Sequence, residues 1–202
     1  MRRVVVTGLG TINPLGNSVE SSWQALINSK SGIKKIDTFN TEDYPCKIAA
    51  TVDDSLIDEN IVSSRDLRKI DRFIALGLIA ADEAIKDSGF VSDENSSLNS
   101  GVMVGSGIGG LDTIYKNSAI LDNQGIRKIS PFFIPSALIN LLSGHISIRY
   151  NLKGPNSSPV TACATGTHAI GDSFTLIKTG KAALVVCGGA EAAICPIGIA
   201  GF

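Results

Sequence analysis

The 202-residue sequence is poor in the residues that build metal centres and disulfide scaffolds. It contains four cysteines and two histidines, with no CxxC pair and no Cys/His spacing that fits a zinc site. The formal net charge is only -1, so bulk charge favours neither nucleic acid nor a membrane surface as a partner. The apolar run AALVVCGGA stops at Glu191, far short of a membrane span. We therefore expect no metal site, no nucleic-acid partner and no membrane partner.

The beginning of the chain and its cysteines indicate a cytoplasmic protein. The apolar run in MRRVVVTGLG is too short for a signal peptide. Disulfides are rare in reducing compartments, so the even number of cysteines does not imply pairing. We expect all four to be free thiols: Cys46, Cys163, Cys187 and Cys195.

Strand and helix patterns alternate along the chain, which predicts an α/β layered architecture with a largely parallel sheet. Hydrophobic residues make up 44% of the chain, enough to fill a sizeable core. No linker rich in Pro, Ser and Gly divides the sequence. Buried strands are expected at 2–8, 100–107, 156–162 and 181–191. Helices are expected at 18–29, 63–89, 111–123, 136–152 and 164–180, with a loop at 125–135 and no closing helix after 191.

Cys163 lies where an expected strand becomes an expected helix, in the stretch SSPVTACATGTHAIG. The first turn of a helix offers unpaired N–H groups and the positive end of the helix dipole. Both favour the thiolate, which is the nucleophilic form of cysteine, and the N–H groups could hold a developing oxyanion. Small neighbours, including Ala162 and Ala164, leave the sulfur open to a substrate. The pattern resembles a strand–turn–helix nucleophile elbow, and the alternative is a buried, inert cysteine.

A nucleophilic cysteine normally has a partner base, and the sequence offers only His145 and His168. His168 follows Cys163 by five residues on the same expected helix, roughly 140° around its axis and more than a turn away. His145 lies in the middle of another expected helix and fits a packed or capped side chain. We expect neither histidine to act as the base.

The glycine-rich loop GSGIGG at residues 105–110 matches the pattern GxGxxG. It follows an expected strand and precedes an expected helix, as in dinucleotide-binding folds. The acidic residue expected about 20 residues later is missing, because that segment is the basic GIRKISPFF. The alternatives are a dinucleotide site and a turn where the backbone approaches a substrate chain, and the second fits better.

Basic residues recur along the expected helix at 63–89 and in the loop after residue 125. The spacing i, i+3, i+4, i+7 places four of them on one helical face: Arg65, Arg68, Lys69 and Arg72. Arg127 and Lys128 lie in the expected loop. A solvated helix face and a docking site for an acidic partner or a phosphate both fit this pattern.

Several blocks of the sequence together resemble the β-ketoacyl-[acyl carrier protein] synthases, most closely the type II synthases of bacterial fatty acid synthesis. The blocks follow the family's order along the whole chain: RRVVVTGLG, NPLGNSVESSW, GSGIGGL, RKISPFFIPS, TACATGTHAIG and CGGAEA. The resemblance implies a thiolase-like fold, in which two similar α/β halves form a five-layered αβαβα sandwich. Residues 1–202 would form its N-terminal domain, with the C-terminal half absent.

The resemblance also implies a Claisen condensation without metal or organic cofactor. Cys163 would take an acyl group from acyl carrier protein as a thioester, and its backbone N–H would serve in the oxyanion hole. Malonyl-carrier protein would then lose CO2, and the resulting carbanion would attack the thioester. The acyl chain would grow by two carbons.

Further positions carry over from the resemblance one by one. Ile108, Gly198 and Phe202 match residues that line the acyl pocket. Phe133 and Ile134 match residues that reach the neighbouring subunit's pocket in a homodimer, whose axis would be crossed by strand pairing at 157–161. Five basic residues match the surface that docks the acidic carrier protein: Arg65, Arg68, Lys69, Arg127 and Lys128.

The sequence departs from the family in its catalytic histidines and lysine. The HGT motif that holds one of the two histidines does not occur in these residues, and neither His145 nor His168 matches them. We therefore expect this chain alone not to elongate acyl chains and to decarboxylate malonyl groups negligibly. Two alternatives stay open: a non-catalytic half-synthase that docks carrier protein, and a thiolase or initiating synthase that uses coenzyme A esters. The RKISPFFIPS block favours an elongating enzyme.

Overall fold

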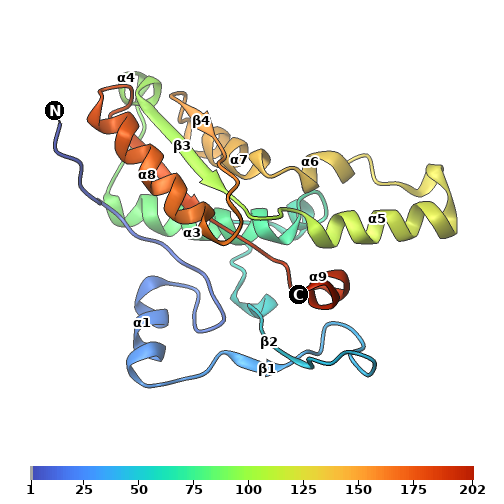
Figure 1. Cartoon of the computed structure of the whole chain (residues 1–202). Coiled ribbons are helices and arrows are strands. Elements are labelled where there is room, and N and C mark those ends of the chain that lie inside the picture. The colour runs from blue at the N-terminus through green and yellow to red at the C-terminus, as the bar shows by residue number, and fades with distance from the viewer. Residues whose placement is uncertain (1) are drawn as a thin grey trace.

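The computed structural model describes residues 2–202, which form an α/β unit around a three-stranded parallel sheet (Figure 1). The strand order is β4-β3-β5, with β3 (Ser100–Gly105) in the centre between β4 (Asn156–Ser157) and β5 (Leu184–Gly189). Strand β3 pairs in parallel with both neighbours. The carboxyl ends of the three strands therefore meet at one edge of the sheet.

Helices cover both faces of this sheet. One face is covered by α3 (Arg72–Ser88) and α7 (Asn140–Tyr150), and the other by α8 (Thr165–Lys178). Successive residues of a strand point to opposite faces. Accordingly, Val104 packs in the cluster formed with α3 and α7, whereas a side chain on Gly105 would point at α8.

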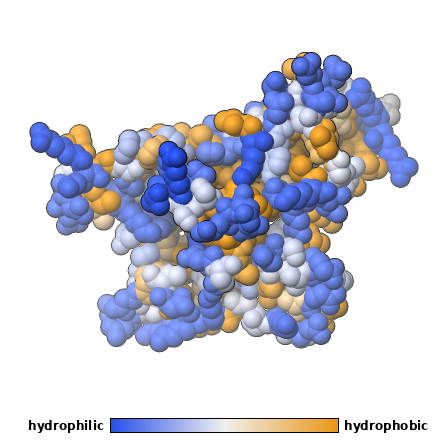
Figure 2. Space-filling view, turned by 180° about the vertical axis from the view of Figure 1, so that it is seen from behind, coloured by the Kyte–Doolittle hydropathy of each residue, from blue (hydrophilic) through white to orange (hydrophobic). Residues whose placement is uncertain are grey.

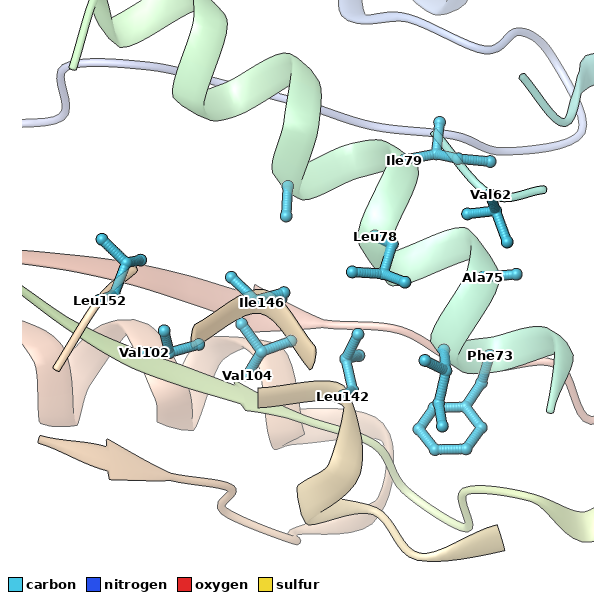
Figure 3. Packing of buried hydrophobic residues seen from close by; sticks show 12 residues of the cluster. Val62, Phe73, Ala75, Leu78, Ile79, Val102, Val104, Leu142, Ile146 and Leu152 are labelled. Atoms are coloured by element: carbon cyan, nitrogen blue, oxygen red, sulfur yellow. The ribbon is translucent and has the colours of Figure 1, made fainter. Parts of the chain in front are cut away.

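The core lies between β3, α3 and α7, as the close view in Figure 3 shows. Phe73 and Ile74 of α3 are fully buried with Leu142 and Ile146 of α7 and Val102 of β3. Complete burial of an apolar side chain of this size stabilises a fold by about 1.5–3 kcal/mol. This cluster therefore fixes β3, and with it the loop that follows β3.

The other elements form an outer layer and the connections. The outer layer lies on the side of α3 away from the sheet (Figure 1) and consists of α1 (Val19–Ile27) and an antiparallel hairpin of β1 (Ile33–Lys35) and β2 (Ile48–Ala50). The rest follow in chain order: η1 (Asp54–Leu56), α2 (Ser64–Leu67), α4 (Glu94–Leu98), α5 (Leu111–Gln124), η2 (Ile126–Lys128), α6 (Phe133–Ala137), η3 (Ala162–Ala164) and α9 (Pro196–Gly201).

The sequence predictions for the centre of the fold are confirmed. Strands β3 and β5 and helices α1, α5 and α8 lie where the sequence predicted them, and the sheet is parallel. Helix α3 ends at Ser88 and is capped by Gly89, whose φ of 65° is the left-handed conformation expected of a glycine at this position.

The prediction of a strand at 2–8 is wrong. The chain here runs along α3 instead, and the N–H groups of Leu9 and Thr11 donate to carboxylates of α3 at 2.9 and 2.8 Å. A Cβ on Gly10 would lie 1.9 Å from a carbonyl oxygen of α3, so the approach requires glycine. Among residues 2–202 no strand pairs with this segment, and without a partner its β-branched residues form no ladder.

Two predicted helices are each broken in two. The stretch 63–89 forms α2 and α3 because the Asp71 side chain accepts the Phe73 N–H at 3.1 Å and starts a new helix. The stretch 136–152 gives way to α6 and α7, separated by Leu138 in an extended conformation. A side-chain cap inside an amphipathic pattern leaves the periodicity unchanged, which explains why the pattern did not reveal the first break.

The end of the chain also differs from the prediction. Only Asn156 and Ser157 of the predicted strand 156–162 pair with β3. After β5, where no helix was expected, Pro196 opens α9. Its fixed φ and missing N–H suit the first helical position.

Large apolar side chains remain on the surface. They include Val6, Trp23, Ile148, Val160 and Phe202. Seen from behind, hydrophobic patches lie between hydrophilic side chains across the middle of the molecule (Figure 2). Exposed apolar surface of this kind is typical of interaction sites. No helix within residues 2–202 has the length and apolar character needed to cross a bilayer.

Candidate active site

Three loops meet at the carboxyl edge of the sheet. One follows β3, one connects β4 to α8 and one follows β5. The Ala190 N–H, just after β5, donates to the Gly105 carbonyl at 3.1 Å. A Cβ on Gly105 would lie 2.1 Å from the Pro159 carbonyl oxygen of the middle loop. Ligands of parallel α/β sheets usually bind at this edge.

The structure places Cys163 just before a helix, as predicted, but the strand that precedes it ends at Ser157. Cys163 lies in the turn η3, immediately before α8, and it is exposed. Its exposure rules out a buried structural cysteine. The thiol is therefore accessible to a substrate at the head of a helix of 14 residues.

The turn that carries Cys163 has an uncommon backbone conformation. Ala162 has a φ of 49°, in the left-handed region, which costs a residue with a side chain about 1–2 kcal/mol. The buried Thr165 hydroxyl donates to the Ala162 carbonyl at 2.8 Å and accepts the Thr161 N–H at 2.9 Å. These hydrogen bonds hold the two residues that precede Cys163.

The backbone N–H of Cys163 is unpaired within residues 2–202. The next N–H, that of Ala164, donates to the Thr161 carbonyl at 3.0 Å, whereas no described group accepts from Cys163. A free N–H beside a nucleophile is the donor that stabilises an oxyanion formed on the attacked carbonyl.

Helix α8 rests on β5 with almost no side chain between them. A Cβ on Gly189 of β5 would lie 3.2 Å from the Gly166 Cα of α8. Ala169 and Ser173 are buried further along the same helix. The head of α8 is therefore fixed against the sheet by contact between two backbones.

The glycine loop after β3 is held by a carboxylate that the sequence did not reveal. Glu191 accepts the Ile108 N–H at 2.8 Å and the Ser106 hydroxyl at 3.1 Å. The Ser106 oxygen in turn accepts the Gly109 N–H at 3.0 Å. In a dinucleotide site the Ile108 N–H would donate to a phosphate, but here it donates to the Glu191 carboxylate. The negative charge of this carboxylate would also repel a phosphate, so the geometry disfavours a dinucleotide site.

Replacing Glu191 by alanine is expected to loosen this loop. Loss of a hydrogen bond to a charged acceptor should raise the hydrogen-exchange rate of the Ile108 amide about tenfold. The Val104 amide, which donates to the Ser143 hydroxyl at 3.0 Å, serves as the control and should keep its rate. Equal exchange of the Ile108 amide in both chains, measured by NMR, would contradict the role of Glu191.

The five predicted pocket residues lie on three segments around α5. Ile108 is partly exposed in the loop before α5. Phe133 and Ile134 begin α6, and Gly198 is buried in α9; both helices pack on α5. Phe202 is almost fully exposed. The glycine loop also approaches residues 161–163, the turn that carries Cys163 and is here called the elbow. A Cβ on Gly107 would lie 3.2 Å from the Ala162 carbonyl oxygen.

The basic residues do not share one helical face, contrary to the prediction. Arg65 lies in α2, and Arg68 follows it as the C-cap. Arg72 lies in α3 and pairs with Asp54. The break places Asp71 between them, where it accepts from the Thr113 hydroxyl at 2.6 Å and where burial raises its pKa.

Part of the basic set meets the RKISPFFIPS segment. The Lys69 ammonium lies 5.6 Å from the centre of the Phe132 ring, a cation–π distance. Arg68, Lys69 and Phe132 line an open cleft of about 720 Å³. Arg127 and Lys128 are exposed in η2, four to five residues before Phe132. Cations and aromatic surface therefore occur together here.

Neither histidine is available to Cys163. His168 is engaged through both ring nitrogens, with the Thr161 hydroxyl and the Asp172 carboxylate, each at 3.2 Å. His145 lies in α7, on the face of the sheet opposite to α8, and burial lowers its pKa. The prediction that neither is placed as the base agrees with this geometry.

The other cysteines lack the setting of Cys163. Cys187 is half-buried in β5 and Cys195 is buried at the start of α9, and burial raises the pKa of both thiols. Cys46 is exposed but follows no strand and begins no helix. The described residues contain no cluster of His, Cys, Asp and Glu that could hold a metal ion.

The fold and the site together define a thiolase-like α/β protein with an accessible cysteine at the head of a helix. Residues 1–202 match the family model described as beta-ketoacyl synthase, N-terminal domain, and the chain belongs to this family. It is 48% identical over 202 residues to 3-oxoacyl-[acyl-carrier-protein] synthase 2 of Coxiella burnetii (strain RSA 493 / Nine Mile phase I). It is 46% identical over 210 residues to the synthase 2 of Rhizobium meliloti (strain 1021).

The chain spans about half the length of these relatives, since the alignments cover 100% of it but 48% and 50% of them. Solved structures agree. A beta-ketoacyl synthase from Burkholderia phymatum STM815 superposes with a TM-score of 0.85 at 26% identity, over 100% of this chain and 50% of that one. A type II polyketide ketosynthase, solved with its acyl-carrier protein and a hexaketide, gives 0.78 at 26% identity, over 99% and 53%.

Proposed function

We propose that this chain provides the nucleophile half of a 3-oxoacyl-[acyl-carrier-protein] synthase, an acyltransferase of fatty acid biosynthesis. The observation that carries the proposal is the exposed Cys163 at the head of α8, with its own N–H unpaired among residues 2–202. The names of the relatives support the substrate class, which is an acyl thioester of acyl carrier protein. Residues 1–202 act as one N-terminal thiolase-like domain.

The first step is transfer of the acyl group to Cys163. The thiolate attacks the carbonyl carbon of the carrier-bound thioester, and the Cys163 N–H donates to the oxyanion. The intermediate collapses with loss of the carrier thiolate, which takes a proton from solvent. The acyl group is then held as a thioester on Cys163.

The second step forms the new carbon–carbon bond. Malonyl-carrier protein loses CO2, and the electron pair stays on the α-carbon. This carbanion attacks the acyl-Cys163 carbonyl, and the Cys163 thiolate leaves. Neither described histidine is placed for this step, so we assign the stabilisation of the carbanion to groups outside residues 1–202.

The acyl pocket forms near the carboxyl ends of the strands, and the dimer forms along the lateral edge of the sheet at β4. Ile108, Gly198 and Phe202 line the pocket, while Phe133 and Ile134 reach the pocket of a second subunit. Strand β4 supports a homodimer because it lies at the edge of the sheet and has β3 as its one partner in the described chain. The segment 157–161 would continue the sheet across the dimer axis.

The acidic carrier protein docks on the basic surface beside the 720 Å³ cleft. The residues in contact would be Arg65, Arg68, Lys69, Arg127 and Lys128. The pairing of Lys69 with Phe132 supports this surface, since a cation over an aromatic ring can meet both a carboxylate and an apolar side chain. A solved ketosynthase of similar fold, in complex with its acyl-carrier protein, supports this partner class.

Alkylation of the 202-residue chain separates the enzyme from a binding scaffold. Cys163 should react with iodoacetamide at neutral pH roughly tenfold faster than Cys46, because cysteines at the head of a helix are in general more reactive than those in loops. Cys46 is the matched control, since both thiols are exposed. Peptide mass spectrometry against time gives the four rates, and slow reaction of Cys187 and Cys195 reports that the chain is folded.

Equal rates for Cys163 and Cys46 in a folded chain would overturn the proposal. They would favour the non-catalytic half-synthase instead. A Cys163→Ser chain should lose the fast reaction and keep the reaction at Cys46.

A further inference from the structure

We infer that Thr165 is the positioning residue of the elbow: its hydroxyl bridges Thr161 and Ala162 and so fixes the direction in which Cys163 presents its thiol and N–H. The inference rests on the proposed function of Cys163. Thr165 touches no reacting atom in this arrangement, so it acts through the backbone that precedes the nucleophile.

The first argument is the hydrogen bonding. Thr165 is 3% exposed, and its hydroxyl uses its single hydrogen on the Ala162 carbonyl at 2.8 Å. A lone pair of the same oxygen accepts the Thr161 N–H at 2.9 Å. One side chain thus satisfies a donor and an acceptor on successive exposed residues, and its own buried hydroxyl has both a donor and an acceptor as partners.

The second argument is the conformation of the bridged segment. Ala162 has a φ of 49°, a value at which a residue with a side chain persists only where its surroundings impose it. The hydrogen bond to its carbonyl is one such restraint. The glycine loop at residues 105–110 also lies against Ala162, because a Cβ on Gly107 would lie 3.2 Å from the Ala162 carbonyl oxygen.

The third argument is that the position of Thr165 itself is fixed. Its methyl group, Cγ2, faces Gly105 at the end of β3, where an added Cβ would lie 2.6 Å from it. This contact therefore fixes the position of the Thr165 hydroxyl on α8, one helical turn after Thr161 and Ala162, which it holds. Valine has the same shape and keeps this contact but cannot make either hydrogen bond, whereas serine keeps the hydroxyl and loses only the methyl group.

These differences define the test, carried out on the 202-residue chain with iodoacetamide as the probe. Thr165→Val should lower the alkylation rate of Cys163 about tenfold, because two lost hydrogen bonds release Ala162 to an ordinary φ. Thr165→Ser should restore most of the rate. The rate at Cys46 should be the same in all three chains, and slow reaction of Cys195 confirms folding.

The outcomes separate this inference from the function on which it rests. If Cys163 reacts no faster than Cys46 in the parent chain, the proposed function fails. If Cys163 is fast in the parent chain and equally fast in a folded Thr165→Val chain, or if serine fails to restore the rate, the positioning role is overturned.

A measurement on the parent chain keeps the inference open to refutation even if the valine chain does not fold. The Thr161 amide should exchange with solvent at least tenfold more slowly than an unprotected amide, although Thr161 itself is exposed. Exchange at the unprotected rate would show that the hydroxyl does not hold this N–H.

Discussion

Replacing Leu142 by alanine is expected to lower the free energy of unfolding by about 3–5 kcal/mol. Leu142 is fully buried where α7 crosses α3, and its methyl groups fill the space over Gly77. Glycine has no side chain that could move into the cavity, so the cost should fall in the upper part of the range for buried leucines. Denaturant unfolding followed by circular dichroism measures it.

The same crossing predicts a strong non-additivity. A Cβ on Gly77 would lie 2.6 Å from both terminal methyl groups of Leu142, so Gly77→Ala should destabilise the parent chain by about 1–3 kcal/mol. In the Leu142→Ala chain the space is free, and the same change should stabilise α3 by up to about 1 kcal/mol. Equal effects of Gly77→Ala in both chains would contradict the described crossing.

A matched control lies on the neighbouring helix. Gly144 is in α7 and has no atom within 4 Å of an added Cβ. Gly144→Ala should stabilise both the parent chain and the Leu142→Ala chain by about 0.5–1 kcal/mol, because it only restricts the unfolded backbone.

Gly105→Ala is the second change with a large expected effect, about 3 kcal/mol of lost stability. The added Cβ would lie 2.1 Å from the Pro159 carbonyl oxygen and 2.6 Å from the Thr165 methyl group. Strand β3 cannot withdraw, because its other face is packed in the core. The segment before the elbow must therefore move.

The movement should also be visible at the thiol. In a folded Gly105→Ala chain, the alkylation rate of Cys163 should fall toward that of Cys46. Gly171→Ala is the control, since Gly171 lies in α8 with nothing within 4 Å of an added Cβ. It should leave the Cys163 rate unchanged and stabilise α8 by about 0.5–1 kcal/mol. An unchanged alkylation rate of Cys163 in a folded Gly105→Ala chain would contradict the contact described between Gly105 and the segment that precedes Cys163.

The central strands and helices could be predicted because their residues carry the signal themselves. The apolar run of β5 and the glycine after α3 are local features. The break before α3 was not predictable from periodicity, because it depends on one carboxylate, that of Asp71, which caps α3 without changing the apolar spacing. Residues 2–8 have the composition of a strand, but strand formation depends on a partner elsewhere.

The candidate site, too, could be predicted from the sequence only where its features are local. The position of Cys163 followed from a strand pattern, a turn of small residues and a helix pattern in consecutive residues. The contact between Glu191 and Ile108 joins residues 83 positions apart, and no local pattern announces it. The role inferred for Thr165 depends on the φ of Ala162, which composition does not encode.

Gly166 and Gly189 pack backbone against backbone, so the part of the molecule that positions the thiol differs from the part proposed to select the acyl chain. The thiol is anchored through glycine to a strand, while the walls proposed to surround an acyl chain come from α6, α9 and the loop before α5. Side chains on those walls can be exchanged for larger or smaller ones without shifting the sulfur. Under the proposed function, one nucleophile held in this way would serve acyl chains of different lengths.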